Sequence, residues 1–466
     1  DDRAGPRLLF SSPAEGEAIL LADMTGDGLS DIVRLRHAEV CYWPNLGHGR
    51  FGRRVTMSDA PRFGARDRFD PRRLRLADID GTGTADLVWI GPDGVWTAAN
   101  RFGNGFAPAR RVARLPDTAP DTHIEVLDLL GRGTAALVWS SARGDGRGGR
   151  LCHIDLMPGT KPWLLVAMQN NLGAETRIDY APSTRYAAED ALAGHPWATR
   201  LPFPVHVVAR VETIDHIGRI ATSARYAYHD GCFDGEDREF AGFGRVDQWD
   251  SDTPVAGADN WDAALWSPPV LTRSWYHTGT PGSAERLDTG AWAEPALRGP
   301  DHATDRARQR LSAPVLPTDL DAAELREANR PLRGTLLRSE VFAQDDTPRA
   351  GLPYSVTETC PEVIRLQPRG PNRHAVFTLR PRESLTTHYE RDPGDPRISH
   401  ELVLETNRWN QPLRSLRIAY PRRVPATVAG LPPAFATALG DTRLVGLFYA
   451  ALSIPSAIAG LLYGTR

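Results

Sequence analysis

Short runs of apolar residues, separated by polar or glycine-rich turns, follow one another along most of the chain. Three stretches in the first 140 residues repeat one pattern: residues 20–35 (LLADMTGDGLSDIVRL), 75–90 (RLADIDGTGTADLVWI) and 125–140 (EVLDLLGRGTAALVWS). In each copy, apolar residues lead into an aspartate, a turn with two glycines follows, and branched or aromatic residues resume. Glycines suit a sharp turn and branched residues favour strands, so each copy predicts strand, loop, strand.

The copies recur at a nearly constant spacing. Their anchoring aspartates, Asp23, Asp78 and Asp128, lie 55 and then 50 residues apart (78 − 23 and 128 − 78). Further strand-like runs follow each copy, and the first two copies continue into Gly/Phe turns. A period near fifty residues with several strands per unit is typical of propeller blades. We therefore interpret residues 1–155 as part of a β-propeller.

The loop after each anchoring aspartate carries candidate ligands for calcium. In the first copy, oxygen-bearing groups stand at positions 1, 3, 5, 7 and 9 of a calcium-loop spacing: Asp23, Thr25, Asp27, the carbonyl of Leu29, and Asp31. The second copy offers Asp78, Asp80, Thr82 and Asp86, and the third only Asp128. The absence of a glutamate at position 12 excludes an EF-hand. Either the first two loops bind calcium, or the aspartates accept hydrogen bonds from nearby backbone N–H groups, as in Asx turns.

A different pattern begins after residue 155. Residues 170–186 alternate with period two and predict a strand. Residues 205–250 predict three strands, with breaks at 217–219, 229–231 and 242–244, and Asp230-Gly231 is a hairpin signal. Strands return from Tyr354, and the last two are separated by a turn at 410–412.

Residues 251–350 form a Pro-rich, polar stretch inside this second region. It contains one helix-like segment, in which Thr318 is a candidate N-cap and Asp321 and Glu324 suit the positive end of the helix dipole. We therefore expect residues 156–430 to be antiparallel strands with a partly helical insert near 251–350. Residues 431–466 form an apolar tail.

Within that tail, residues 444–463 are twenty uncharged, mostly apolar residues, a length that just spans a bilayer. Pro455 and the flanking Arg443 and Arg466 weaken that reading. A buried helix or a tail created by truncation or frameshift are the alternatives. The chain begins with Asp1 and has no signal peptide, so we expect a fragment of a longer protein.

Composition narrows the function classes. A net charge of −3 with 41% apolar residues describes a soluble globular protein and gives no support for nucleic-acid binding. Lys161 is the only lysine among 55 Lys and Arg residues, a bias that the base composition of a genome explains. The four cysteines are widely spaced and indicate neither a disulfide framework nor a zinc site. Instead, Cys41, Trp96 and Cys152 are expected at one equivalent, inward position of the blades.

An enzyme is not indicated. No nucleophile elbow, HExxH, P-loop or Rossmann motif is present, and the histidines lack metal-ligand spacing. Asp234, Glu236, Asp237 and Glu239 cluster within six residues, but such a run is usually a solvated face.

Several stretches resemble one protein family. Residues 23–35, 41–52 and 76–90 resemble the middle N-terminal region of the B component of bacterial toxin-complex (Tc) insecticidal toxins, the SpvB/TcdB-type proteins. Residues 168–184, 228–250 and 407–423 resemble the middle C-terminal region of the same proteins. The resemblance implies an all-β chain in which FG-GAP-like (VCBS-like) propeller blades precede antiparallel Rhs-like shell strands.

The resemblance also implies a structural role in a secreted complex. In that family the propeller docks on the pore-forming A component, and B together with an Rhs-type C component encloses an unfolded toxic cargo whose release the propeller gates. Membrane contact would then come only through the A component, and assembly in the cytoplasm before export is compatible with this role. Two blade turns are candidate docking surfaces, with these residues: Trp43, Asn45, His48, Phe51, Asn100, Phe102, Asn104 and Phe106.

An integrin-like FG-GAP propeller for adhesion or carbohydrate binding is the alternative. It accounts for residues 1–155 but leaves the second region without a role. A seven-bladed head would also need four more Asp/Gly repeats, and none follows residue 155.

Overall fold

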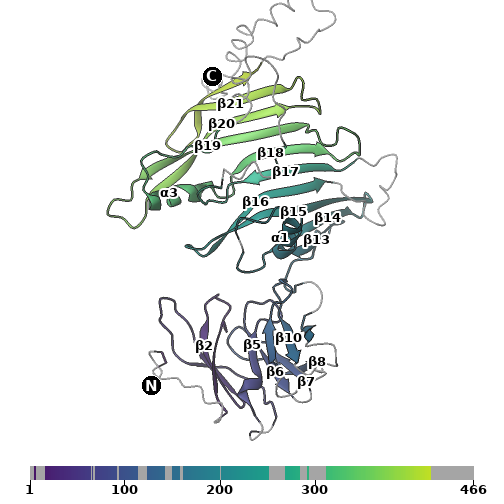
Figure 1. Ribbon diagram of the computed structural model, residues 1–466, viewed down its shortest axis with the longest axis vertical. Helices are drawn as coiled ribbons and strands as arrows, with labels where there is room; N and C mark the ends of the chain where they lie inside the picture. The colour runs from purple at the N-terminus through teal and green to yellow at the C-terminus, as the bar shows by residue number, and fades with distance from the viewer. Residues whose placement is uncertain are drawn as a thin grey trace, which may run out of the picture. The chain divides into compact units, whose positions relative to one another are not determined.

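The computed structural model divides into two compact units, which are described separately (Figure 1). Unit 1 comprises residues 1–166 and 203–207, and unit 2 comprises residues 167–202 and 208–466. The structure describes residues 5–6, 16–64, 66, 69–91, 94–113, 123–141, 150–157, 161–199, 201–250, 268–283, 291–292 and 311–420. The predicted apolar tail, including residues 444–463, lies outside these ranges. Within them, no helix has the length and hydropathy needed to cross a bilayer.

Unit 1 contains three antiparallel sheets, one for each copy of the repeat. The first sheet has the order β1-β2-β3-β4 and the second the order β5-β6-β7-β8, while β10 is central in the third. Their strands are β1 (Ala18–Ala22), β2 (Asp31–Arg36), β3 (Glu39–Trp43), β4 (Val55–Thr56), β5 (Leu74–Ala77), β6 (Asp86–Gly91), β7 (Gly94–Ala98), β8 (Arg110–Ala113), β9 (His123–Leu127), β10 (Ala136–Ser141) and β11 (Arg150–Asp155). A short 3-10 helix, η3 (Pro71–Arg73), precedes β5.

The sheets pack face to face in sequence order. Side chains of a strand alternate between the two faces of a sheet, so the second sheet contacts both of its neighbours. Leu87 and Trp89 of β6 pack against the first sheet, where Val33 lies in the same core. Val88 and Ile90 of β6 point the other way and share a second core with the third sheet. All six residues of β6 are therefore buried.

The register confirms that the three copies are structurally equivalent. The third residue after the start of β2, β6 and β10 pairs with the next strand in the same way: Arg34 with Cys41, Trp89 with Trp96, and Trp139 with Cys152. Of the three predicted inward positions, Cys41 is fully buried, whereas Trp96 and Cys152 are half-buried against the two cores. All four cysteines are free.

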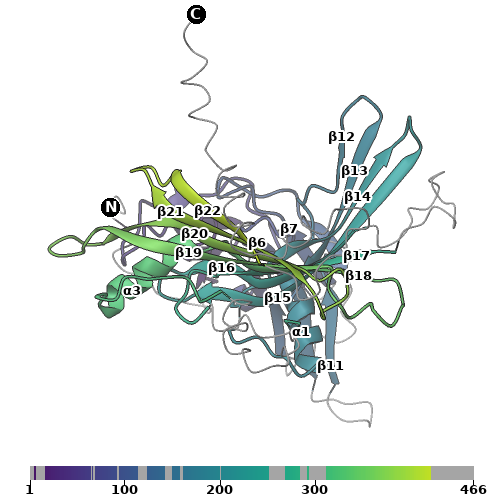
Figure 2. The same ribbon diagram turned by 90° about the horizontal axis from the view of Figure 1, so that it is seen from above.

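Unit 2 is built on one antiparallel sheet of eleven strands, β12 to β22, each hydrogen-bonded to its neighbours in sequence (Figures 1 and 2). The strands are β12 (Ala167–Gln169), β13 (Ala174–Pro182), β14 (His206–Asp215), β15 (Ile220–Asp234), β16 (Glu239–Asp250), β17 (Val270–Tyr276), β18 (Leu336–Ala343), β19 (Ser355–Gln367), β20 (Val376–His388), β21 (Arg397–Thr406) and β22 (Pro412–Ala419). The helix α1 (Ser183–Leu192) contacts β13 and β15, and α3 (Ala322–Asn329), followed by the 3-10 helix η5 (Arg330–Leu332), contacts β20. The chain is thus predominantly antiparallel β-sheet, as predicted.

Three details of the second region differ from the sequence analysis. Residues 251–350 contain two strands of the sheet, β17 and β18, and are not only an insert. The predicted helix is present as α3, but its N-cap is Asp321, whose carboxylate accepts the N–H of Glu324 at 2.8 Å. The strands β15 and β16 run through the breaks predicted at 229–231 and 242–244.

The acidic run between β15 and β16 is not a freely solvated face. Arg326 of α3 makes ion pairs of 2.6–2.9 Å with Asp234, Glu236 and Asp237. Arg333 pairs with Glu239 at 2.8 Å. The turn therefore holds α3 and η5 on the sheet.

Candidate functional site

The first Asp/Gly loop is held by carboxylates that accept backbone N–H groups. One oxygen of Asp23 accepts the N–H groups of Thr25 (3.1 Å) and Gly26 (2.7 Å), and the other accepts that of Gly28 (2.7 Å). Asp27 accepts the N–H of Leu29 at 2.9 Å. These are the bonds of an Asx-type turn.

The other two loops repeat this arrangement. Asp78 accepts the N–H groups of Gly81 (2.7 Å), Thr82 (3.1 Å) and Gly83 (2.9 Å), and Asp80 also accepts from Thr82 (3.1 Å). In the third loop, Asp128 accepts from Arg132 (2.8 Å) and Gly133 (2.7 Å). The Asx-type bonds to the anchoring aspartate therefore recur in all three copies of the repeat.

One fully buried aspartate connects each of the first two Asp/Gly loops to the turn that follows the next two strands. Asp31 accepts the N–H groups of Met24 (3.0 Å) and Asn45 (2.7 Å). Asp86 does the same with Ile79 (3.1 Å) and Asn100 (2.8 Å). Burial raises the pKa of Asp31, and it raises the pKa of Asp86 to about 7.

The first and second sheets are joined at this end by Asn100. Its side-chain amide donates to the carbonyls of Met24 (2.9 Å) and Ala85 (3.0 Å). Ala85 also donates its N–H to the carbonyl of Asp23 at 2.7 Å. The Asp/Gly loops and the two predicted docking turns consequently lie at one end of the sheets, because the first and third connections of an antiparallel meander fall on the same side.

The predicted docking residues divide by burial. Three of them are buried and present no surface to a partner: Trp43, Phe106 and Asn100. Asn45 and Phe51 are half-buried and are paired in an isolated β-bridge. His48, Asn104 and Phe102 are exposed, Phe102 by 61%, and Leu46, which the sequence analysis did not select, is exposed by 62%.

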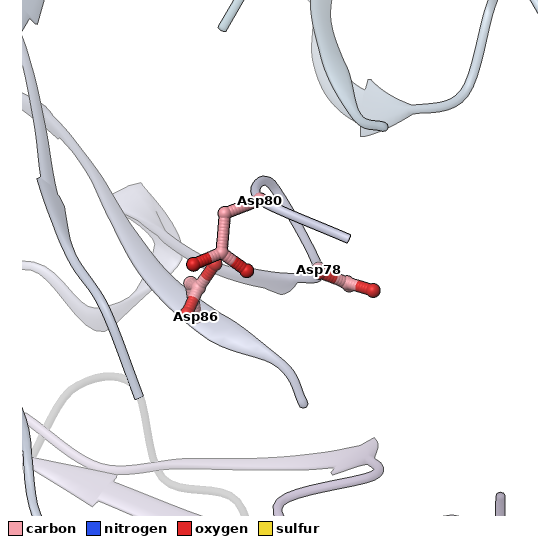
Figure 3. Close-up of side chains that lie close together, drawn as sticks. All are labelled: Asp78, Asp80 and Asp86. Atoms are coloured by element: carbon pink, nitrogen blue, oxygen red, sulfur yellow. The ribbon is translucent and has the colours of Figure 1, made fainter. Parts of the chain in front are cut away.

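Among the described residues, one group of three carboxylates has the spacing of a metal centre (Figure 3). One oxygen from each of Asp78, Asp80 and Asp86 lies within 4.8 Å of the others. Calcium takes six to eight oxygens at 2.3–2.6 Å, so these three would supply part of a coordination shell. Thr82 donates its N–H to the cluster and its hydroxyl oxygen contacts that of Thr84 at 3.0 Å. Calcium at the first and second loops stays a prediction.

Basic side chains of unit 1, which includes the first two residues of β14, lie on the second and third loops. The Cε atom of Lys161 lies 2.6 Å from the position that a Cβ atom on Gly81 would occupy. The Cε1 atom of His206 lies 2.8 Å from the corresponding position on Gly133. Burial, and next the charge of Lys161, lower the pKa of His206. The sequence analysis missed both contacts because they join positions about 70–80 residues apart.

We expect Asp78→Ala to destabilise unit 1 by about 1–2 kcal/mol, because three backbone N–H groups lose their acceptor at a partly exposed loop. Urea unfolding in EDTA and in calcium measures the loss. The Asx-turn reading predicts equal losses in both buffers, and a loss confined to calcium would establish the metal reading instead. Arg53→Ala, at an exposed position, is the control.

Two protein-family models match parts of this chain. The family model of the insecticide toxin TcdB middle/N-terminal region matches residues 98–279, and that of the TcdB middle/C-terminal region matches residues 327–443. The first match includes residues 168–184 and 228–250, which the sequence analysis assigned to the middle C-terminal region, so that assignment was wrong. No curated protein matches the chain.

Solved structures give the same result. A TcdB2–TccC3 crystal structure is 32% identical, with a TM-score of 0.76 over 90% of this chain and 20% of that chain. TcdB2–TccC3–Cdc42 is 31% identical, with a TM-score of 0.76 over 90% and 19%. The Photorhabdus luminescens Tc holotoxin pore is 30% identical, with a TM-score of 0.76 over 91% and 19%. The chain therefore spans about a fifth of the length of the solved chains that it matches.

Proposed function

Because this chain belongs to the TcdB-type B components of insecticidal toxin complexes, we propose that it is a non-enzymatic, structural part of a secreted toxin complex. The carrying observation is the similarity of nine tenths of this sequence, at 32% identity, to a chain of a TcdB2–TccC3 structure. The partners would be an Rhs-type C component and a pore-forming A component, as TccC3 and the holotoxin pore accompany the solved relatives. Assembly in the cytoplasm before export belongs to this proposal.

The sheet of unit 2 is suited to form part of the wall of a hollow shell. Its eleven strands pair strictly in sequence order, and several are 12–15 residues long. A sheet of this kind extends by adding hairpins at an edge, without crossovers. Its antiparallel pairing also leaves each face free to be covered or solvated independently.

Unit 1 is suited to be part of a propeller. Three sheets of equivalent register pack face to face in order, and β6 is covered on both faces. Closure needs at least four blades, so further blades would complete the ring. In the assembled complex this propeller would dock on the A component and gate release of the enclosed cargo.

Electron microscopy of the protein, co-expressed with an Rhs-type C component, tests this role. A hollow particle capped by a propeller is the expected result. Solid particles without a cavity would contradict the shell and favour the adhesion propeller.

The docking face is proposed to include the turns Asn45–Phe51 and Asn100–Phe106. The two turns form one surface through Ser58, which follows the first turn. Its carbonyl accepts the N–H of Phe106 (3.1 Å), and its N–H donates to the carbonyl of Asn104 (3.0 Å). Exposed Phe102 and Leu46 give this surface large apolar side chains that a bound partner would cover. Lys161 and His206 lie against Gly81 and Gly133 of the second and third Asp/Gly loops at the same end, whereas Phe102 and Leu46 of the two turns are exposed.

We expect the double variant His48→Glu, Phe102→Glu to weaken binding to the A component by about tenfold or more, roughly 1.4 kcal/mol. Biolayer interferometry with purified A component measures the change. Arg72→Glu is the matched control: it lies before β5, at the opposite end of the sheets, and its side chain is 77% exposed. Loss of binding in Arg72→Glu with none in the double variant would move the docking face to that end.

A further inference from the structure

Most of the segment 183–199, which lies on the sheet of unit 2, is exposed to solvent (Figure 1). It consists of α1 and the loop that follows, and of the helix only Ser183 and Tyr186 are buried. Leu192 is 90% exposed, and the N-cap residue, Pro182, makes no side-chain cap bond. An isolated helix as short as this one is marginal in water, so its place depends on its attachments to the sheet.

Asp190 of α1 joins this segment to the sheet through His229 of β15. Both carboxylate oxygens of Asp190 lie within hydrogen-bond distance of the Nδ1 atom of His229, at 2.9 and 2.8 Å. One of these oxygens also accepts the indole N–H of Trp197 at 2.7 Å. The indole lies over Gly231, whose carbonyl accepts the hydroxyl of Thr199 at 2.7 Å. His229 is therefore central to the attachment of both the helix and the loop.

The other ring nitrogen of His229 faces a second carboxylate. Its Nε2 atom lies 3.7 Å from Oδ2 of Asp247 on β16, and the side chains of His229 and Asp247 are 15% and 5% exposed. Two arginines flank that carboxylate: the Nε atom of Arg245 lies 3.1 Å from one oxygen, and that of Arg273, on β17, lies 3.4 Å from the other. Among the described residues, these are the charged groups around the ring: Asp190, Asp247, Arg245 and Arg273.

Only the doubly protonated ring satisfies both carboxylates. Asp190 accepts hydrogen bonds, so Nδ1 of His229 carries a proton in either charge state. In the neutral ring, Nε2 would present a lone pair to Asp247, and in the part of the chain that the structure describes no group hydrogen-bonds this buried atom. In the imidazolium, Nε2 donates towards Asp247 instead, and both contacts become charge-assisted. Burial acts to raise the pKa of Asp247, but the His229 ring and the charge of Arg245 outweigh it, and the pKa is lowered.

We propose that His229 is a proton-operated latch for the segment 183–199. With the ring charged, its contacts to Asp190 and Asp247 hold α1 and the loop on the sheet. Loss of the Nε2 proton removes the charge, turns a lone pair towards Asp247 and weakens the attachment. Histidine changes its charge between about pH 5 and pH 8, so the segment is held firmly at the acidic end of this range and loosens towards the basic end.

The place of the latch in the chain gives it a consequence beyond the helix. The segment is followed by residues 203–207 of unit 1, so the latch acts beside a crossing of the chain from one unit to the other. This inference does not depend on the proposed docking or shell roles.

The test is hydrogen–deuterium exchange of the full chain at about pH 5.5 and about pH 8, with the rates corrected for the intrinsic effect of pH on exchange. In the wild type we expect the amides of the segment 183–199 to be about tenfold better protected at the lower pH, because charge-assisted hydrogen bonds are roughly twice as strong as neutral ones. His229→Gln can still donate to Asp190 but does not titrate, so it should show the weaker protection at both pH values.

Asp247→Asn is the second variant, since its amide can donate to the lone pair of the neutral ring and the pH difference should largely disappear. His374→Gln is the matched control: His374 also pairs with a carboxylate, at 2.7 Å, but is 59% exposed, and this variant should keep the wild-type difference in the segment 183–199. Equal protection of the wild-type segment at both pH values overturns the proposal, as does a His229→Gln variant that keeps the difference. If His229→Gln fails to fold, Asp247→Asn decides: loss of the difference supports the latch, and its retention overturns it.

Discussion

Replacing Arg338 with methionine is expected to destabilise unit 2 by about 3–5 kcal/mol, because it leaves a buried carboxylate without its cation. Arg338 is 3% exposed and Glu340 is fully buried. The Nε of Arg338 donates to Glu340 at 2.7 Å, and its guanidinium also contacts Glu358 on the neighbouring strand β19. Both glutamates belong to one network centred in the sheet.

The same glutamates also hold the segments that lie against the sheet. Glu340 accepts the backbone N–H of Trp292 at 3.0 Å, and Glu358 accepts that of Leu311 at 2.9 Å. The ring of Trp292 then packs edge-on against Tyr389. Loss of Arg338 should therefore loosen these attachments as well as the strand pairing.

Urea unfolding of Arg338→Met, Glu340→Gln and the double variant measures the network. We expect the double variant to lose less than the sum of the single variants, with a coupling of about 1–3 kcal/mol. Arg417→Met is the matched control, since its pair with Glu401 is exposed on both sides and should contribute about 0–1 kcal/mol. Additive losses would show that Arg338 and Glu340 act independently.

This network also explains why the sequence analysis missed β18. The segment LLRSEVFA places Arg338 and Glu340 on one face of a strand, where a binary pattern predicts solvent. Their burial is compensated by their own ion pair, by the N–H of Trp292 and by Glu358, which lies 20 and 18 residues further along the chain. The three sheets of unit 1, in contrast, follow from the sequence, because their repeat and their alternating apolar residues are both local.

The hairpin predicted at Asp230-Gly231 failed for a tertiary reason. A Cβ atom at Gly231 would lie 2.5 Å from the ring of Trp197, so the glycine is needed for a close approach and not for a turn. The chain turns four residues later, between Asp234 and Glu239. Likewise, the sequence supplied the aspartates of the second loop, but not the lysine that lies on it 80 residues further on.

Acidification should destabilise unit 2 through His277. This residue is 3% exposed, and burial lowers its pKa from 6.5 to about 4. Its Nδ1 accepts the N–H of Gly279 at 2.9 Å, which requires the neutral ring with the proton on Nε2. A proton added to Nδ1 would face that N–H donor and remove the bond.

The sign follows from these facts. The folded state holds the neutral ring, so the contribution of His277 is fully present above the unfolded pKa of 6.5. It is lost as the pH falls from 6.5 towards 4, where the folded protein also takes up the proton. The difference between the pKa of His277 in the unfolded chain, 6.5, and in the folded protein, about 4, corresponds to about 3 kcal/mol of stability lost over that window.

Urea unfolding of the wild type and of His277→Asn, measured between pH 7 and pH 4, isolates this effect. The asparagine oxygen can still accept the N–H of Gly279 but does not titrate in this range. We expect His277→Asn to be less stable at pH 7 because it leaves space in the core, and to lose about 3 kcal/mol less than the wild type on acidification. His48→Asn, at an exposed turn, should follow the wild-type profile. Parallel profiles for wild type and His277→Asn would assign the acid sensitivity to other groups.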